Sequence, residues 1–366
     1  MKKIIKNKEN GEKIKLPKTK IQKLKLKHKN LIIIIGVLLL ILSCLFIFTN
    51  NKSEKQENEK VKKPAEKQEE KINIVDINSK NRPYAIMINN VSTARPLQSG
   101  LQDAFIIYEI IVEGGITRYL ALFQDVNTER IGSIRSARHY YLDYALENDA
   151  IYVHHGTSPQ AQSDFSALGV DRIEISTPKT GWRDKSLKVA SEHTLFTSME
   201  LLANGLKNKR TERNKDYLLN YSSEKIDLSK GESNIKADKV EIEYSNNTTT
   251  SYQYNKEEQV YYRYVNNKEH TDYVTKKQYT FKNIITYQVK NYTLNDPENK
   301  GRQGIENVGS GEGYYITNGY ATKIKWKKEC RECQTKYTTM NDDELKVNDG
   351  NTFIQIQPTN KDLVIE

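Results

Sequence analysis

The sequence predicts a mixed α/β domain followed by a mostly antiparallel β domain, both placed behind one apolar segment near the amino terminus. Three observations lead to this prediction. Residues 31–48 are almost uninterruptedly apolar, strand-like runs alternate with helical patterns between residues 76 and 225, and residues 237–360 are dense in tyrosine and threonine with strand-like alternation. We therefore expect two domains, 76–225 and 237–360, with the break in the polar run 222–236.

The net charge of +10 lies entirely in the first 30 residues. Those residues contain twelve lysines and two acidic residues, whereas residues 31–366 contain 45 basic and 45 acidic side chains. Because a lysine-rich segment before an apolar one stays on the cytoplasmic side, we expect residues 1–30 to be a cytoplasmic tail and the folded domains to be extracellular. The neutral remainder lacks the basic surface that nucleic-acid binding requires, which argues against that class.

The apolar residues 31–48 would span roughly 27 Å as a helix, which is just enough for a bilayer core. We predict a retained transmembrane anchor. A cleaved lipoprotein signal is the alternative, because residues 41–44, ILSC, have the pattern of a lipobox in which Cys44 would carry the lipid. The long basic region and the apolar residues after Cys44 favour the anchor. Residues 49–75 are rich in Lys, Glu, Gln and Asn, which predicts a disordered linker.

The first domain alternates strand-like and helix-like stretches. Strands are predicted at residues 84–88, 105–112, 117–123 and 150–153. Helices are predicted from Ser136, as the N-cap, to about Asn148, and near residues 160–168 and 195–207.

The pair Gly114-Gly115 predicts a two-residue turn between the strands 105–112 and 117–123. This register pairs Glu113 with Ile116 and Glu109 with Leu120. Side-chain alternation would then place Glu109, Glu113 and Arg118 on one face, with the guanidinium between the two carboxylates.

Arginines gather where the helix after residue 135 is predicted to begin. Arg135, Ser136 and Arg138 would combine free backbone N–H groups, the positive end of a helix dipole and two guanidinium groups, which suits a phosphate or carboxylate ligand. Arg95 and Arg118 are candidates to join this ligand-binding site. The alternative is a structural network in which these arginines pair with Glu109, Glu113 and Asp143.

Two histidines and two carboxylates are candidates for acid/base chemistry. His155 follows the strand 150–153, at the edge where α/β domains place ligands, and His193 is the second histidine candidate. Ordinary surface or hydrogen-bonded histidines are the alternative. Glu109 and Glu113 are the carboxylates that would serve as acid or base. We expect no metal site.

The second domain has the alternation of an antiparallel β structure. Asn318-Gly319 and Asp349-Gly350 predict tight turns, and the glycines of residues 309–313 predict a plain β-turn. Cys330 and Cys333 leave two alternatives open, a local disulfide or two inert thiols, and they lack the further ligands that zinc needs. Strands are predicted at residues 252–254, 260–264, 284–289, 313–316, 321–326 and 352–356.

The longest motifs are RPYAIMINN at 82–90, EIIVEGGITR at 109–118 and IGSIRSAR at 131–138, followed in the second domain by Tyr262-Arg263 and VGSG at 308–311. Together they cover about residues 78 to 360 and resemble the YerB family of Gram-positive cell-envelope proteins, which carry a DUF3048 domain of undefined activity. The resemblance implies an envelope location and a two-domain plan, but it supplies no catalytic residue. Family members are often lipoproteins, and the apolar extension past Cys44 departs from that pattern.

We therefore expect a membrane-tethered extracytoplasmic protein that binds a cell-wall polymer or a wall-synthesis or wall-remodelling protein. The alternative is an enzyme acting on an anionic, lipid-linked wall precursor. In that case Arg135 and Arg138 would hold the pyrophosphate, and Glu109 or Glu113 would act as acid, base or cation ligand. The sequence identifies no cofactor and leaves open whether the protein is an enzyme.

Overall fold

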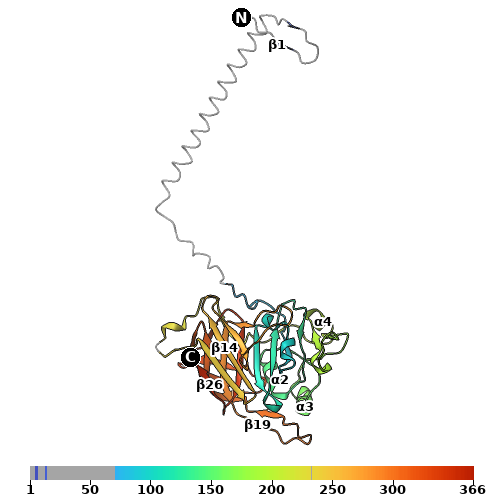
Figure 1. Ribbon diagram of the computed structural model, residues 1–366, viewed down its shortest axis with the longest axis vertical. Helices are drawn as coiled ribbons and strands as arrows, with labels where there is room; N and C mark the ends of the chain where they lie inside the picture. Colours follow the sequence, from blue (N-terminus) through green and yellow to red (C-terminus); the bar gives the residue numbers. More distant parts are fainter. Residues whose placement is uncertain (1–4, 7–12, 15–70, 232) are drawn as a thin grey trace. The chain divides into compact units, whose positions relative to one another are not determined.

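The computed structural model describes residues 5–6, 13–14, 71–231 and 233–366 (Figure 1). The chain divides into two compact units, Met1–Glu69 and Glu70–Glu366. In the first unit the strands β1 (Ile5–Lys6) and β2 (Lys13–Ile14) pair antiparallel. The predicted anchor, the lipidation candidate Cys44 and the linker up to residue 70 lie outside the described residues. Among the residues that are described, no helix is both long and apolar enough to cross a membrane.

One sheet of eleven strands runs through the described part of the second unit. Its strands come from both predicted domains. In spatial order they are β12 (Ile235–Lys236), β22 (Tyr320–Lys328), β21 (Gly309–Thr317), β18 (Asn283–Val289), β25 (Thr352–Pro358), β4 (Ile106–Ile111), β5 (Thr117–Phe123), β3 (Tyr84–Asn89), β7 (Ile151–His154) and β8 (Arg172–Glu174), with β23 (Lys336–Thr339) paired to β22.

The centre of this sheet is a parallel pair formed by β4 and β25, in which Ile106 lies opposite Thr352 and Ile110 opposite Ile356. Both strands are buried along their whole length. The strand β25 comes almost last in the chain, yet it lies between β18 and β4. One hydrophobic core therefore includes residues of both predicted domains.

A second sheet covers the central sheet on one face. Gln355 of β25 accepts a hydrogen bond from the Tyr244 hydroxyl (2.8 Å) and donates one to the Tyr252 hydroxyl (2.8 Å), and the rings of Phe281 and Phe353 lie 4.8 Å apart. The strands of this second sheet are β16 (Lys268–Glu269), β15 (Val260–Val265), β14 (Thr248–Asn255), β13 (Lys239–Ser245) and β26 (Leu363–Ile365), with β17 (Thr280–Phe281) paired to β15.

The opposite face of the central sheet is covered by α2 (His139–Glu147). The Tyr141 hydroxyl lies within hydrogen-bond distance of the carbonyl oxygens of Ile110 (2.9 Å) and Arg118 (2.8 Å) and shares its one proton between them, and the Tyr108 ring lies 4.9 Å from the Tyr144 ring. The central sheet is therefore buried between a helix and a second sheet.

Smaller elements complete the described part of the second unit. The further helices are α3 (Pro159–Ala167) and α4 (Met199–Ala203), with the 3₁₀ turns η1 (Arg95–Leu97), η2 (Leu101–Asp103), η3 (Glu113–Gly115), η4 (Ser191–His193) and η5 (Leu228–Lys230). The small sheets pair β10 (Leu195–Thr197) with both β6 (Ile131–Gly132) and β9 (Trp182–Arg183), β11 (Asn220–Ser222) with β24 (Lys346–Asn348), and β19 (Asn291–Thr293) with β20 (Gln303–Ile305).

The turn between β4 and β5 differs from its prediction. The loop has three residues, Glu113–Gly115, and it is closed by a hydrogen bond from Val112 N to Ile116 O (2.8 Å). Glu109 therefore lies opposite Tyr119 rather than Leu120. Because the side-chain period of a strand is two, this one-residue slip moves Arg118 to the face opposite Glu109.

The helix α2 also begins later than predicted, with Arg138 rather than Ser136 as its N-cap. The preceding residues are held as an extended stretch, because Ala137 N donates to Gly156 O (3.0 Å) and His155 N donates to Arg135 O (3.1 Å). Ala137 of the predicted helix, together with Arg135 just before it, is thus hydrogen-bonded to the chain after β7 instead of to the helix itself.

The other helix predictions are mixed. The helix predicted near 160–168 is confirmed as α3, where the Ser158 hydroxyl accepts from Ala161 N. The stretch 195–207 instead begins with the strand β10, and Ser198 caps the short α4. With only short helices among the described residues, the unit is mostly β rather than the α/β layer expected of its first half.

Each strand predicted in the second half overlaps an observed strand, and the tight turn at Asn318-Gly319 joins β21 to β22 as expected. Both turn residues have positive φ, as a type I′ turn requires. Asp349-Gly350 is not a hairpin turn, because β24 pairs with β11 and not with β25. The glycines of 309–313 are wrongly predicted as a turn, since they form the start of β21 along β22.

Candidate functional site

The parallel strands β3 and β7 lie side by side and end at one edge of the central sheet. The residues that follow them, Asn89-Asn90 and His155-Gly156, are crossed there by the extended stretch 133–138. Arg135 N donates to Met87 O (2.9 Å), which ties this stretch to β3. Ligands of α/β proteins are bound at such carboxyl ends of parallel strands.

Five arginines gather at this edge, together with three carboxylates that contact them. We call this set the arginine edge. It consists of Arg118, Arg135, Arg138, Arg172, Arg183, Glu113, Glu174 and Glu192. With five guanidinium groups and three carboxylates, the set carries a net charge of +2, and except for the buried Arg118 and the exposed Glu174 and Glu192 its members are half-buried.

One carboxylate serves two of these arginines. Arg138 binds Glu113 through two nitrogens, with Nη2 3.0 Å from Oε2, and Arg118 Nη2 lies 3.8 Å from the same oxygen. Burial raises the pKa of Glu113, but the hydrogen bond and charge of Arg138 outweigh it, so the net pKa is below its ordinary value. The pKa of Arg118 is lowered to about 10, chiefly by burial and also by the nearby charges of Arg138 and Arg135, while the charge of Glu113 opposes the shift.

Arg135 has a weaker partner. Its Nη2 lies 3.2 Å from Glu192 Oε1, and the Glu192 side chain is 56% exposed. His193 Nε2 is 3.4 Å from the same carboxylate, and its Nδ1 is 3.0 Å from the Asn89 amide nitrogen. Because an ion pair with an exposed carboxylate contributes little, the guanidinium of Arg135 can be transferred to a ligand at a small cost in free energy.

His155 faces the arginine edge as a hydrogen-bonded imidazole. Its Nδ1 lies 2.9 Å from Ile175 O, which can only accept, so Nδ1 carries the proton. The other nitrogen, Nε2, lies 3.3 Å from Arg183 Nη2 and accepts from it. Arg172 Nη1 is 3.4 Å from Glu174 Oε2 and 3.3 Å from His154 Nε2. This arrangement holds Arg183 without a carboxylate partner among the described residues.

Glu109 lies on the other face of the sheet, in what we call the buried network. Its Oε2 accepts from Arg263 Nη2 (2.7 Å), and both side chains are fully buried. Its Oε1 accepts from the hydroxyl of Thr117 (2.6 Å), and the hydroxyl of Thr250 lies 3.1 Å from Oε2. A carboxylate with this many donors is fixed in place and has no exposed atom with which to meet a substrate.

The buried network continues to Arg95. Arg263 Nη1 donates to His270 Nδ1 (2.6 Å), and His270 in turn bonds the side chain of Gln98. Arg95 donates to the side chain and carbonyl of Asn90 (3.0 Å each), and Asn90 donates to Thr117. The structure therefore brings Arg118, Arg135, Ser136 and Arg138 together, through the Arg118 bond to Ser136 O (2.6 Å), and places Arg95 with Glu109.

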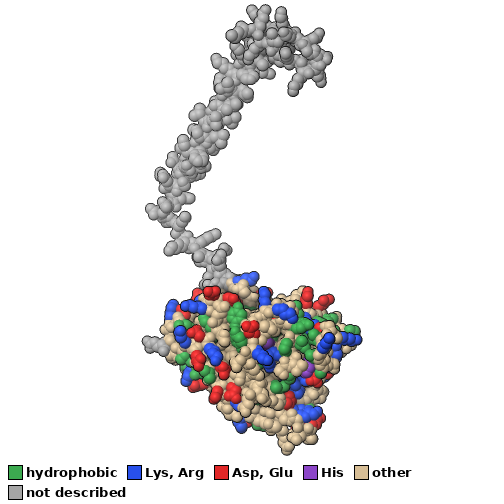
Figure 2. Space-filling view, viewed as in Figure 1, with side chains coloured by type: hydrophobic (Ala, Val, Ile, Leu, Met, Phe, Trp, Pro, Cys, Tyr) green, Lys and Arg blue, Asp and Glu red, His purple; other side chains and the backbone are tan. Residues whose placement is uncertain are grey.

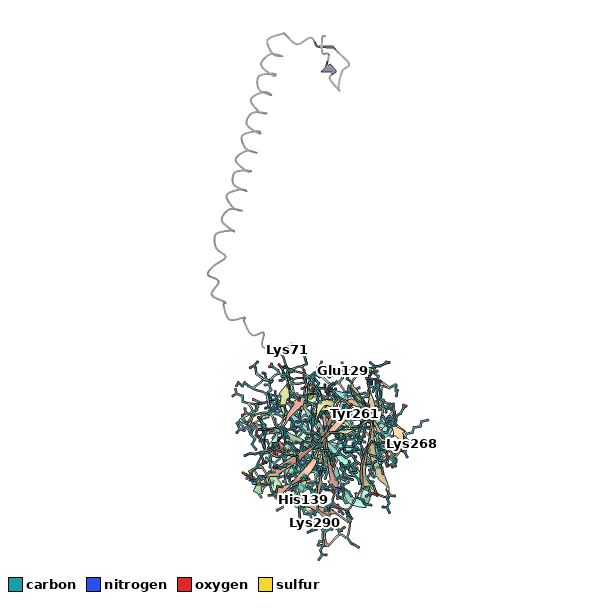
Figure 3. All side chains as sticks on the ribbon, turned by 90° about the vertical axis from the view of Figure 1, so that its left-hand side faces the viewer. Lys71, Glu129, His139, Tyr261, Lys268 and Lys290 are labelled. Atoms are coloured by element: carbon teal, nitrogen blue, oxygen red, sulfur yellow. A yellow bond between two sulfur atoms is a disulfide. The ribbon has the colours of Figure 1, made fainter. Side chains whose placement is uncertain are left out.

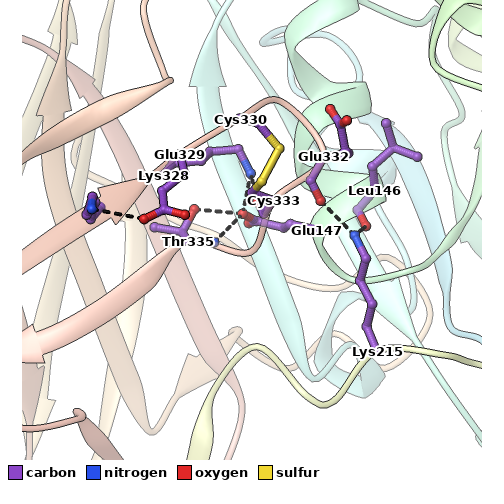
Figure 4. Close-up of a disulfide and its surroundings, with 10 residues drawn as sticks. Leu146, Glu147, Lys215, Lys328, Glu329, Cys330, Glu332, Cys333 and Thr335 are labelled. Atoms are coloured by element: carbon purple, nitrogen blue, oxygen red, sulfur yellow. Dashed lines mark hydrogen bonds and ion pairs between the residues drawn. A yellow bond between two sulfur atoms is a disulfide. The ribbon is translucent and has the colours of Figure 1, made fainter.

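A second buried ion pair joins α2 to β22 beneath a disulfide (Figure 4). Lys328 Nζ donates to Glu147 Oε2 (2.8 Å), which also accepts from Thr335 N (3.1 Å). The disulfide Cys330–Cys333 closes the loop just after β22, and Lys328 Nζ also donates to Cys333 O. No sequence pattern predicts this pair, because Glu147 and Lys328 lie far apart in the chain and neither belongs to a motif.

Charges of both signs are interspersed over the visible face of the second unit (Figure 2). Residues 71–366 contain 39 basic and 39 acidic side chains, so the excess at the arginine edge is local. Within the described ranges, no group of three His, Cys, Asp or Glu side chains could hold a metal ion. Figure 3 shows Lys71 and Glu129 toward one end of the unit and His139 and Lys290 toward the other.

Known proteins resemble this chain over most of the second unit. Two family models match it, "Protein of unknown function (DUF3048) N-terminal domain" at residues 72–212 and the corresponding C-terminal domain at residues 240–354. The "Putative lipoprotein YerB" of Bacillus subtilis (strain 168) is 29% identical over 257 residues, which are 68% of this chain and 74% of that protein. The crystal structure of YerB from Bacillus subtilis superimposes with a TM-score of 0.66 at 27% identity, covering 78% of this chain and 94% of that one.

Proposed function

The chain belongs to the DUF3048 family, and from this premise we propose that it is an extracytoplasmic envelope protein whose arginine edge binds an anionic group. The ligand would be a phosphate or carboxylate of a cell-wall component, or of a protein that synthesises or remodels the wall. The observation that carries the proposal is the excess of guanidinium groups over carboxylates at the ends of β3 and β7.

Binding rather than catalysis is favoured by the state of Glu113. Its pKa is lowered below the ordinary value, so this carboxylate is ionised at neutral pH and cannot act as a general acid. Both of its oxygens are engaged by Arg138. Glu109, the second carboxylate considered for acid/base work, is sealed in the buried network.

The test is a calorimetric titration of residues 70–366 with inorganic pyrophosphate. This fragment is one compact unit with the described hydrophobic core, and it lacks the lysine-rich tail that would bind any polyanion. We expect saturable binding that Arg135→Ala weakens by about tenfold, as the loss of one charge-assisted hydrogen bond predicts.

The matched control is Arg213→Ala. Arg213 stacks on the Tyr217 ring, with its guanidinium carbon 3.7 Å from the ring centroid, and it is not part of the arginine edge. Its replacement is expected to leave pyrophosphate binding unchanged. Absence of saturable binding, or equal losses in the two variants, would refute the arginine edge as an anion site.

We further propose that the protein is tethered to the outer face of the membrane, through residues 31–48 or through a lipid on Cys44. The support is the positive-inside pattern of the tail and the description of the Bacillus subtilis relative as a lipoprotein. Labelling producing cells with radioactive palmitate separates the two forms of tether, since a lipid on Cys44 gives label that Cys44→Ser abolishes. Recovery of the whole chain in the soluble fraction would refute both.

A further inference from the structure

A groove separate from the arginine edge lies where the two family segments meet. It has a volume of about 1,020 Å³, and no member of the arginine edge lines it. The first segment contributes the stretches 100–103 and 127–130, and the second contributes Glu258, Tyr262 and the stretch 272–280. This volume is at the upper end of the range for small-molecule sites, about 300 to 1,000 Å³.

The walls of the groove are tied to each other by hydrogen bonds. The Gln102 side chain donates to Thr280 O (2.9 Å) and accepts from Thr280 N (3.0 Å). Asp272 Oδ2 accepts from Gly100 N (2.7 Å) and from the Tyr279 hydroxyl (2.8 Å). Because these bonds join the two segments directly, the groove is formed before any ligand enters, which lowers the cost of binding.

Tyr262 gives the groove a fixed aromatic surface. It lies on the half-exposed side of β15. Its neighbours Tyr261 and Arg263 point to the opposite side of the strand and are buried. Its hydroxyl donates to Glu258 Oε2 (2.9 Å), which restricts rotation of the side chain. A tyrosine held in this way offers an apolar ring face with a polar tip.

Polar groups with unused hydrogen-bonding capacity line the same groove. Gln278 donates to Arg263 O (2.8 Å) through its nitrogen, which leaves its amide oxygen available. The side chains of Asn127 and Glu129 have no hydrogen-bond partner within the described part of the chain. Uncharged and carboxylate acceptors beside an aromatic ring suit a ligand that has hydroxyl groups on an apolar frame.

The charge of the groove excludes the class of ligand assigned to the arginine edge. Four carboxylates and two basic side chains line it, which gives a net charge of −2. Of the two basic groups, Arg130 is engaged: its Nη1 lies 2.9 Å from Asp184 Oδ2 and its guanidinium lies 3.6 Å from the centre of the Phe196 ring. A polyphosphate or another polyanion would be repelled.

We propose that this groove binds an uncharged oligosaccharide. A pyranose ring has an apolar C–H face that fits against Tyr262, and its hydroxyl groups can donate to Gln278 and Glu129 and accept from the Asn127 amide. The proposal goes beyond anion binding at the arginine edge and does not depend on it, because the two sites share no residue.

The probes are the β-1,4-linked tetramers of N-acetylglucosamine and of glucose, each titrated into residues 70–366 by calorimetry. We expect at least one tetramer to bind saturably, and Tyr262→Ala to weaken binding at least about tenfold. The control is Tyr264→Ala, which removes the same side chain from the same side of β15 but outside the groove, and it is expected to bind within about twofold of the parent. Affinity should stay constant as salt is raised from about 50 to about 500 mM, since the ligand has no charge.

Three outcomes would overturn the proposal: no saturable binding of either tetramer, equal effects of Tyr262→Ala and Tyr264→Ala, or a steep loss of affinity with salt. Pyrophosphate binding measured on the same two variants separates this result from the anion proposal. Tyr262→Ala should leave it unchanged, so either proposal can fail while the other stands.

Discussion

The buried network and the arginine edge contain the same kinds of side chain on opposite faces of β4 and β5, yet the two regions differ in solvent access. In the buried network, the side chains of Glu109 and Arg263 are fully buried and paired one to one. At the arginine edge, Glu113 is shared between Arg118 and Arg138, and the partner of Arg135 is half exposed.

This difference shows that a motif of the family can serve either stability or ligand binding. Which of the two it serves depends on whether its charged side chains are buried. In the motif Tyr262-Arg263, the guanidinium of Arg263 in the second sheet pairs with the buried Glu109 carboxylate of the central sheet. The motif IGSIRSAR at 131–138 contributes cations in excess of the nearby carboxylates. Substitution of Arg263 should therefore destabilise the fold strongly. Substitution of the arginines in IGSIRSAR should leave the fold stable but weaken ligand binding.

The largest expected effect is that of Arg263→Met. It leaves the Glu109 carboxyl group without its ionic partner in the core, and we expect a loss of about 3 to 5 kcal/mol of unfolding free energy. Urea denaturation of residues 70–366 measures it. At the arginine edge, Arg135→Met should cost no more than about 0.5 kcal/mol. Equal stability of the two variants would contradict the distinction between the buried network and the arginine edge.

A double variant sharpens the same point. Adding Glu109→Gln to Arg263→Met removes the unpaired charge, so the pair should be less destabilised than the sum of the two single changes. Additive effects would show that the two side chains do not compensate each other.

A smaller effect is expected from the disulfide over the second buried pair. Replacing Cys330 and Cys333 together by Ser opens a very short loop, for which chain entropy predicts a loss of about 2 kcal/mol. Reduction of the parent protein by dithiothreitol should produce the same loss. If the reduced parent is as stable as the oxidised one, the disulfide does not hold the loop over Glu147 and Lys328.

At the arginine edge, Glu113→Gln should change binding more than stability. The substitution removes a negative charge and frees Arg118 and Arg138, so pyrophosphate should bind about two- to fivefold more tightly. Calorimetry on residues 70–366 measures the change, with Glu241→Gln on β13 as a control that should have no effect. Weaker binding in Glu113→Gln would mean that the carboxylate positions the arginines for the ligand.

The smallest effect concerns pH. The folded pKa of Glu113 is below its ordinary value, so its ion pair stabilises the fold above the unfolded pKa, and this contribution is lost as pH falls through the folded pKa. Between about pH 5 and about pH 3, the parent should therefore lose more unfolding free energy than Glu113→Gln. Parallel pH profiles from urea denaturation would show that Glu113 does not contribute.

Much of this structure follows from local sequence patterns. The strands at 84–88 and 117–123 and the helix near 160–168 are found as predicted, because the hydrophobic periodicity that predicts them is a local property of the sequence. The wrong predictions concern features that depend on tertiary packing. Two glycines allow a two-residue or a three-residue turn, and only packing on both faces of the sheet selects the register that separates Glu109 from Arg118.

The candidate site shows the same limit. The cluster of Arg118, Arg135 and Arg138 was predictable, since all three lie in neighbouring motifs. The partner of Glu109 was not, because Arg263 is 154 residues away and reaches it only when the second sheet covers the first. The later start of α2 was also unpredictable, since it depends on hydrogen bonds from residues 135–137 to the chain after β7.

The central position of β25 has a consequence for the order of events in folding. Residues 352–358 fill the place between β18 and β4, so the middle of the sheet stays open until nearly the whole chain is available. Pairing over such long sequence separations is slow. Until β25 is in place, β18 and β4 have unpaired edges to which other chains could bind. A chain truncated before residue 352 would therefore leave uncovered the hydrogen-bonding edge of β4 that pairs with β25.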